Sequence, residues 1–261
     1  MPADGGDRPM SGIRTSTDLA GRVLRVTIDR PDRMNAVDLP TLSELGRVIR
    51  TAGEDVRTIV LTGSGRAFCS GADLLSMSGA SPDDVMDIAN GVIRAIVESP
   101  VPVVAAVNGP AVGFGVALAC AADLTYAAEN AYFALSFTSV GLMPDGGSTA
   151  LVTAAIGRAR VSEMTLLGER LSAADAERTG LIGRALPAEE LSTHVAAVAA
   201  RLATGARRAL ELTKRDLVAA SIPGIDATLD RERSGQIELM ATADFAEGAS
   251  AVMSKRPPNF S

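Results

Sequence analysis

Hydrophobic and polar residues alternate with a period of two near the start of the chain, and this spacing predicts β-strands. Between Arg22 and Asp29, the residues Leu24, Val26 and Ile28 share one face. Such alternation is typical of a strand that buries one side. Further strands are predicted at residues 58–62, 101–107 and 124–127.

Helical periodicity fills the segments between these strands. Asp38 is a typical N-cap residue, and Pro40 suits the first turn that follows it. One apolar face then collects Leu42, Leu45, Val48, Ile49 and Ala52. Helices are also predicted over residues 81–98 and from Gly113 onward. Alternating strands and helices predict a layered α/β core.

The strand pattern stops near residue 189, and helical patterns take its place. They cover residues 189–203, 206–220, 228–241 and 243–253. Residues 1–12 are polar, rich in Gly, Pro and Asp, and lack the apolar segment of a signal peptide. We therefore expect a flexible tail over 1–12, an α/β core over 13–195 and a helical region over 196–261.

Composition narrows the class of protein. The 261 residues are 47% hydrophobic with no Trp, which favours an aliphatic interior, and the formal net charge is −6. This charge and the absence of a long basic run disfavour a nucleic-acid surface. Cys69 and Cys120 are typical of reduced thiols in a cytoplasmic protein. The longest apolar region is interrupted before the roughly 20 residues that span a bilayer, so we expect no membrane segment.

Several chemistries are disfavoured by residues that the chain lacks. His194 is the single histidine, and no cluster of His and Cys has metal-site spacing. Leu118 stands where a dinucleotide-binding loop needs its last glycine. We therefore expect no metal and no cofactor.

Two glycine-containing turns follow predicted strands. Gly113-Phe114-Gly115-Val116-Ala117 follows the turn Asn108-Gly109-Pro110 and opens an apolar helix. Backbone N–H groups at a helix start favour negative charge on a bound oxygen. The alternative interpretation is a tight connection without a ligand. Residues 65–74, GRAFCSGADL, form the second turn and supply a second set of N–H groups.

These turns resemble a known family when taken with residues 30–36, RPDRMNA, and the terminal residues 255–260, KRPPNF. From about Gly21 to Phe260 the chain resembles the crotonase superfamily, the enoyl-CoA hydratase/isomerase family. The resemblance implies a spiral of β-β-α turns with C-terminal helices that form a homotrimer or a hexamer. It also implies a CoA thioester substrate, whose oxygen lies between the backbone N–H groups of Ala72 and Phe114.

The same resemblance implies contacts for the rest of the substrate. The bent CoA is expected along Asn35, Ala36, Ala72, Asp73, Leu74 and Leu75, with Arg33 and Lys255 as phosphate partners. The acyl pocket is expected to include Met77, Met86, Phe114, Phe137, Leu142 and Met143. Exposed bases are often merely solvated, and Met side chains also fill ordinary cores, so these alternatives stay open.

Hydratases of this family use two glutamates, and this chain has neither. The alignment puts Ala117 at the first glutamate position and Phe137 at the second. Each acid or base normally contributes about 10²- to 10⁴-fold to the rate, so hydration by the usual route is disfavoured. Asp145 stands where dienoyl-CoA isomerases and some enoyl-CoA isomerases of the family place a catalytic aspartate. It also suits an N-cap for a helix beginning near Gly147.

The remaining acids have simpler interpretations. Asp73 and Asp123 are expected to brace loops, and Glu98, Glu129 and Glu163 are expected on exposed surfaces. Three functions then remain: an isomerase with Asp145 as base, an enoyl-CoA hydratase, and a non-catalytic protein that binds acyl-CoA.

Overall fold

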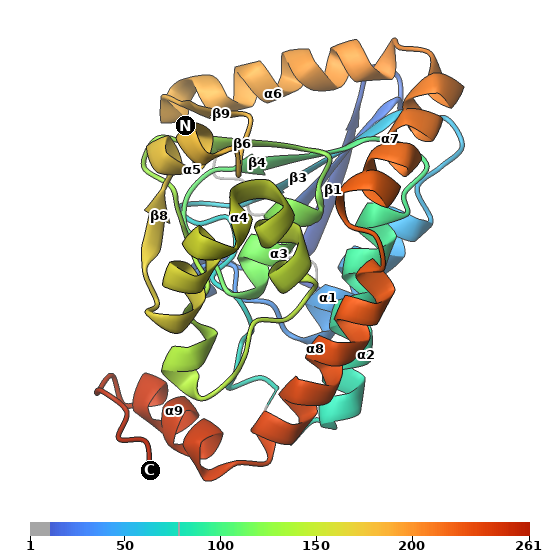
Figure 1. The fold of residues 1–261 in the computed structure, drawn as a ribbon. Coiled ribbons are helices and arrows are strands. Elements are labelled where there is room, and N and C mark those ends of the chain that lie inside the picture. Colours follow the sequence, from blue (N-terminus) through green and yellow to red (C-terminus); the bar gives the residue numbers. More distant parts are fainter. Residues whose placement is uncertain (1–10, 78) are drawn as a thin grey trace.

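The computed structural model describes residues 11–77 and 79–261, so residues 1–10 of the expected tail lie outside the described part. A six-stranded sheet with the order β1-β2-β3-β4-β6-β9 forms the centre (Figure 1). Its strands are β1 (Ile13–Asp18), β2 (Val23–Ile28), β3 (Thr58–Gly63), β4 (Val103–Val107), β6 (Leu124–Ala128) and β9 (Arg184–Leu186). The strand β1 is antiparallel to β2, and the other neighbours are parallel.

A second, three-stranded sheet lies beside the central one. It contains β5 (Ala111–Val112), β7 (Tyr132–Ala134) and β8 (Arg170–Ser172), in the order β5-β7-β8. Gly113 donates its N–H to the carbonyl of Ala134 at 2.8 Å, which attaches the glycine loop to this sheet. Strands of two or three residues leave almost no periodic pattern, and the sequence did not predict them.

Helices cover both faces of the central sheet. The helices are α1 (Leu39–Arg50), α2 (Pro82–Val97), α3 (Phe114–Ala121), α4 (Ser148–Leu166), α5 (Ala173–Thr179), α6 (Ala188–Ala203), α7 (Arg207–Ser221), α8 (Ile225–Met240) and α9 (Ala243–Met253). Short 3-10 helices span Pro31–Arg33 (η1) and Ser136–Val140 (η2). Asp38 caps α1 by accepting from the N–H of Thr41 at 2.9 Å, as predicted. The predicted α/β fold is confirmed.

Alternate residues of the strands face opposite cores, as the period of two requires. Leu24, Val26 and Ile28 join the larger core, with the apolar faces of α1, α2 and α3. Val23, Val60 and Val104 point to the other side and pack against α6, which lies across that face of the sheet (Figure 1). Because Ala199 and Ala203 belong to this second core, the domain boundary expected at residue 195 falls inside a helix that covers the sheet.

The helices α7 and α8 follow one another along the side of the molecule where α2 lies, and α9 lies at the end far from α6 (Figure 1). Among the described helices, none combines the length and apolar character needed to cross a bilayer. The helix α8 runs beside α2, and Arg233 joins the two by ion pairs to Asp83 and Asp87, each at 2.6 Å. The C-terminal helices therefore pack onto the same core that carries the glycine loops.

Lys214 attaches α7 to the core. Its Nζ lies 2.8 Å from Oδ2 of Asp123 and also donates to the carbonyls of Ile96 and Val101. The same Asp123 oxygen accepts from the N–H of Val103 at 2.7 Å, which confirms the predicted bracing role of Asp123. Burial raises the pKa of Asp123 and lowers that of Lys214, so each charge depends on its partner.

We predict that Lys214→Met lowers the free energy of unfolding by about 3 kcal/mol, because it leaves the carboxylate of Asp123 buried without its cation. Urea unfolding at neutral pH measures this change. Arg215→Met, an exposed position on the same helix, is the matched control and should stay within about 0.5 kcal/mol of wild type. Equal unfolding midpoints for both variants would contradict the anchoring role.

Candidate active site

The two predicted glycine loops leave the same edge of the central sheet. Residues 64–74 follow β3, and residues 108–113 follow β4, its parallel neighbour. The carboxyl ends of adjacent parallel strands meet at one edge, which is where α/β sheets bind ligands. An isolated bridge between Cys69 and Ala111 then holds the loops together.

Two asparagines, the buried Asn35 and the partly buried Asn108, shape the first of these loops. The Nδ2 of Asn35 donates to the carbonyls of Ser64 and Ala67 at 2.8 and 2.7 Å. The Oδ1 of Asn108 accepts from the N–H of Gly63, and its Nδ2 donates to the carbonyl of Ala67. The expectation that Asn35 contacts CoA is wrong for its side chain, because Asn35 is 0% exposed and its amide is fully used by the protein.

The N–H groups of Ala72 and Phe114 are oriented away from backbone acceptors. Val37 pairs with Ala72 in a parallel bridge by donating to the carbonyl of Gly71 and accepting from the N–H of Asp73. The N–H of Ala72 therefore points to the other side of its loop. Phe114 is the first residue of α3, where an N–H has no acceptor within the helix.

The loops also approach each other closely at these residues. A Cβ placed on Gly71, directly before Ala72, would lie 3.8 Å from the backbone N of Phe114. A Cβ on Gly113 would lie 3.7 Å from Cζ of Phe137, so the Phe137 ring packs against the loop at Gly113. The structure thus brings the two predicted N–H donors side by side, with an aromatic ring over the loop between them.

Asp145 lies in the loop between η2 and α4, and this loop contacts α3. Its neighbour Gly146 packs on α3, since a Cβ there would lie 2.8 Å from both Cβ of Ala117 and Cε2 of Phe114. The Oδ2 of Asp145 accepts from Nε2 of Gln236 at 2.8 Å. Its Oδ1 is buried and has no hydrogen-bond partner within the part of the chain that the structure describes.

The alternative that the side chain of Asp145 caps α4 is wrong. The N-cap of α4 is Gly147, and no side chain of its own caps the helix there. The first turn is instead satisfied from α8, because Glu232 accepts from the N–H groups of Gly147 and Thr149 at 2.6 and 3.0 Å. The carboxylate of Asp145 is therefore not occupied by the helix start.

The environment of Asp145 favours the protonated acid. Burial of the carboxyl raises its pKa to about 7, and the negative charge of Glu232 acts in the same direction. The hydrogen bond from Gln236 opposes the rise, because it stabilises the carboxylate. A group with a pKa near neutrality can both accept and release a proton at physiological pH.

The two positions that the resemblance assigns to hydratase glutamates are both apolar and buried. Ala117 is 0% exposed and Phe137 is 8% exposed. Gly146 lies against Ala117, so the loop that carries Asp145 covers the first position. Neither side chain can transfer a proton.

The residues expected to contact CoA differ in their exposure to solvent. Arg33, Ala72, Leu75 and Lys255 are exposed, whereas Asp73 is buried. Ala36 and Leu74 are partly buried. The carbonyl of Ala36 accepts a hydrogen bond from Arg30. Arg33 and Lys255 lie on separate segments, at the end of η1 and after α9. Their roles toward phosphate stay a prediction.

Asp73 is a brace, as predicted. Its Oδ2 lies 3.0 Å from an Arg30 nitrogen, and that nitrogen lies 2.8 Å from Asp38. Its Oδ1 accepts from the N–H of Ser76. These contacts lower the pKa of Asp73 against the effect of burial, which keeps it ionised.

The residues expected in the acyl pocket differ in how deeply they are buried. Phe114, Phe137 and Leu142 are buried in the main core, and Met77 packs against it. Met86 is 0% exposed on α2, whereas Met143 is half-buried. Whether they contact an acyl chain stays a prediction.

The remaining candidate residues lie elsewhere. His194 packs edge-on against Tyr126, with 4.6 Å between ring centroids, and Glu98, Glu129 and Glu163 are exposed as predicted. Across the described ranges, no group of three or more His, Cys, Asp or Glu side chains is placed to hold a metal ion.

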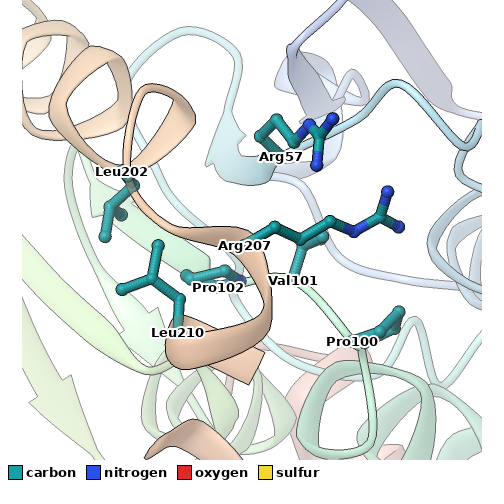
Figure 2. Close-up of a pocket in the computed structure, with 8 residues that line it drawn as sticks. Arg57, Pro100, Val101, Pro102, Leu202, Arg207 and Leu210 are labelled. Atoms are coloured by element: carbon teal, nitrogen blue, oxygen red, sulfur yellow. The ribbon is translucent and has the colours of Figure 1, made fainter. Parts of the chain in front are cut away.

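Two surface hollows lie at the opposite edge of the sheet from the loops. Figure 2 shows one, which includes Arg57, Val101 and Pro102, just before β3 and β4 begin, and Leu210 of α7. The other has a volume of about 240 Å³ and includes Asp123 and Leu124, where β6 begins. Neither includes a loop residue of the site.

Sequence reasoning missed Gln236 and Glu232, which hold the Asp145 loop from α8. Both are almost completely buried, at 0% and 1% exposure. They occupy neighbouring turns of α8, a spacing that a solvated helix face also shows. A pair of polar residues within an otherwise polar helix gave no local signal.

Comparisons with known proteins agree over nearly the whole chain. The family model described as "Enoyl-CoA hydratase/isomerase" matches residues 18–261. A probable enoyl-CoA hydratase of Rhodobacter capsulatus is 42% identical, over 90% of this chain and 93% of its own. A 1,2-epoxyphenylacetyl-CoA isomerase of Escherichia coli is 36% identical, over 91% and 94%. An enoyl-CoA hydratase structure from Mycobacterium avium subsp. paratuberculosis has a TM-score of 0.90 at 41% identity, covering 97% of this chain and 100% of its own.

The raised pKa of Asp145 predicts a pH-dependent cost to stability. Because the folded state holds this proton up to about pH 7, while an unfolded aspartate releases it near pH 4, stability falls as the pH rises between these values. Asp145→Asn removes the charge but keeps an acceptor for Gln236. It should raise the free energy of unfolding by up to about 4 kcal/mol at pH 8.

Urea unfolding of both proteins at pH 8 and near pH 4 measures this difference. The gain from Asp145→Asn should nearly vanish near pH 4, where the wild-type carboxyl is protonated in the folded state and about half protonated in the unfolded state. A gain of the same size at both pH values would show that the carboxyl is not held protonated by the fold.

Proposed function

Because the chain belongs to the enoyl-CoA hydratase/isomerase family of the crotonase superfamily, we propose that it moves the double bond of an enoyl-CoA thioester. Asp145 is the base in this proposal. The observation that carries it is the buried carboxylate of Asp145, which has one oxygen unoccupied by the described protein and lies next to α3. Apolar residues at Ala117 and Phe137 support isomerisation over hydration.

The proposed reaction needs a single carboxylate. Oδ1 of Asp145 accepts a proton from C2 of a 3-enoyl-CoA, and the electron pair of the C2–H bond delocalises onto the thioester oxygen. The C3–C4 double bond becomes part of the resulting dienolate. Asp145 then returns the proton to C4, and the double bond forms between C2 and C3. The product is the conjugated 2-enoyl-CoA, with no other reactant consumed.

The negative oxygen of the dienolate needs donors already in position. The N–H groups of Ala72 and Phe114 point away from backbone acceptors and lie on loops in contact. Each such donor contributes roughly 3 kcal/mol to stabilising the charged intermediate. The positive end of the α3 dipole lies behind Phe114 and acts in the same direction.

A pKa of about 7 suits this cycle. A stronger acid would be a poor base toward C2, and a weaker one would release the proton to C4 slowly. Burial keeps water away from the carboxyl and maintains this pKa.

Hydration is the second candidate, because several relatives carry that name. The similar proteins of Rhodobacter capsulatus and Mycobacterium avium subsp. paratuberculosis are named as hydratases. The E. coli relative is named as an isomerase of an epoxide-bearing CoA thioester. A non-catalytic acyl-CoA-binding protein is the third candidate, since the two N–H donors suffice to bind a thioester oxygen.

Two further expectations stay predictions. The first is that the reaction needs no cofactor beyond the CoA thioester itself. The second is assembly into a homotrimer or hexamer, for which the exposed apolar residues Leu166, Leu167 and Leu217 provide support, because they are 73%, 71% and 63% exposed.

We predict that purified protein converts 3-enoyl-CoA into 2-enoyl-CoA, and that Asp145→Asn lowers the rate by at least about 10²-fold. Acyl-CoA affinity should stay near wild type, because the N–H donors of Ala72 and Phe114 and the loops expected to contact CoA are unchanged. Absorbance of the conjugated thioester follows the rate, and calorimetry follows the affinity.

Asp216→Asn, a 73% exposed position on α7, is the matched control and should keep the wild-type rate. A wild-type rate in Asp145→Asn would contradict the role of Asp145. Loss of crotonyl-CoA absorbance would instead identify hydration. Tight acyl-CoA binding without turnover of either substrate would favour the binding protein.

A further inference from the structure

Two residues of α8, Glu232 and Gln236, make five hydrogen bonds to the loop that carries Asp145. We propose that Gln236 and Glu232 are positioning residues, which hold this loop against α8 and leave Oδ1 of Asp145 as the one carboxylate oxygen available for proton transfer. The inference rests on the proposed role of Asp145 as base. It goes beyond that role by proposing that two residues of α8, far from Asp145 in sequence, set the position and the pKa of its carboxyl group.

Gln236 contacts the loop with both ends of its amide. Nε2 donates to Oδ2 of Asp145 at 2.8 Å, and Oε1 accepts from the N–H of Met143 at 3.1 Å. The two contacts fix the amide orientation, because a reversed amide would place donor against donor at Met143. Since Oδ2 is thereby occupied, the carboxylate cannot exchange its two oxygens without breaking a buried hydrogen bond.

Glu232 holds the other end of the same loop. Its two carboxylate oxygens accept from the N–H groups of Gly147 and Thr149 and from the hydroxyl of Thr149. Glu232 is 1% exposed, so it supplies a buried negative charge at the N-terminus of α4. The loop from Met143 to Thr149 is thus bound to α8 on both sides of Asp145.

Gly235 lets the loop lie close to the helix between these contacts. A Cβ placed on Gly235 would lie 2.3 Å from the sulfur of Met143. A mid-helix glycine costs roughly 1 kcal/mol relative to alanine. Its presence here makes room for the Met143 side chain, one turn away from Glu232.

The helix α8 is itself attached to the core by α2. The side chain of Asn90 donates to the carbonyl of Leu229 at 3.3 Å, and Arg94 pairs with Asp226 at 2.7 Å. Arg233 pairs with Asp83 and Asp87 on the same side. A helix with contacts along this length is a rigid support for the Asp145 loop.

Charged groups around Asp145 come mainly from α8. Glu232 raises the pKa of Asp145, and Arg231 acts on Glu232. The η2 segment has no acidic or basic residue, and in α3 the one titratable residue is Cys120, at its far end. On α9, which packs on η2, Asp244 accepts from Ser261 and Glu247 pairs with Arg256.

The geometry predicts opposite effects for two substitutions. Gln236→Met keeps the side-chain length but removes the hydrogen bond to the carboxylate, so the pKa of Asp145 should rise by about 1 unit or more. Glu232→Gln keeps one of the two acceptor oxygens but removes the negative charge, so the pKa of Asp145 should fall. A merely structural role for α8 would not shift the pKa in both directions.

Infrared titration of the ligand-free proteins tests this directly. The carboxyl band of Asp145 is identified by its loss in Asp145→Asn, and its midpoint is followed from pH 4 to 10. The wild-type midpoint is expected at about 7, that of Gln236→Met about 1 unit higher or more, and that of Glu232→Gln lower.

Glu238→Gln is the matched control, because it removes the same charge from an exposed position on the same helix. It should keep the wild-type midpoint. Unfolding curves verify that each variant is folded. If Gln236→Met does not fold, Gln236→Glu takes its place, and the midpoint should again rise, since two carboxylates then compete for one proton.

Rates for 3-enoyl-CoA separate this inference from the proposed function. The midpoint of kcat against pH should follow the infrared midpoint in each variant. Gln236→Met should lose about 5-fold or more in kcat at pH 7 with KM unchanged, because a pKa about 1 unit higher lowers the ionised fraction of Asp145 from about one half to about one tenth. Shifted infrared midpoints in proteins that do not isomerise would support the positioning roles and overturn the isomerase function. An active wild type with unshifted midpoints in folded variants would overturn the positioning roles alone.

Discussion

The site depends on one costly arrangement, a carboxyl group that is buried with only one of its two oxygens hydrogen-bonded. Asp145 receives one hydrogen bond, from Gln236, and its second oxygen has no partner within the described chain. Native proteins normally satisfy such groups or leave them in water. The resulting rise in pKa costs stability at neutral pH, and the core and the contacts from α8 must offset that cost.

The rest of the fold places two backbone N–H donors on loops near the one that carries this carboxyl. Adjacent parallel strands, β3 and β4, deliver two loops to the same edge of the sheet, where the N–H groups of Ala72 and Phe114 lie on loops in contact. The same helix start that presents Phe114 also packs its side chain on Gly146. Donors and base are therefore coupled through α3, and a shift in one loop would disturb both.

Sequence patterns predicted the strands and helix ends that depend on neighbouring residues along the chain. The strands β2, β3 and β4 and the Asp38 cap of α1 follow from periodicity and capping, whereas β1 escaped because five of its six residues are exposed. Asp145 was found through the family resemblance. Gln236 was not, because its contact spans 91 positions of sequence. Contacts of that separation depend on how α8 packs on the core, which no local pattern records.

The central claim is that a single carboxylate carries a proton from C2 to C4. A 3-enoyl-CoA deuterated at C2 tests it, with the position of deuterium in the product read by mass spectrometry or NMR. We expect deuterium at C4 of the 2-enoyl-CoA formed by the wild-type enzyme, and no such product from Asp145→Asn. Formation of a 3-hydroxyacyl-CoA, or an isomerised product with deuterium absent from C4, would contradict the account.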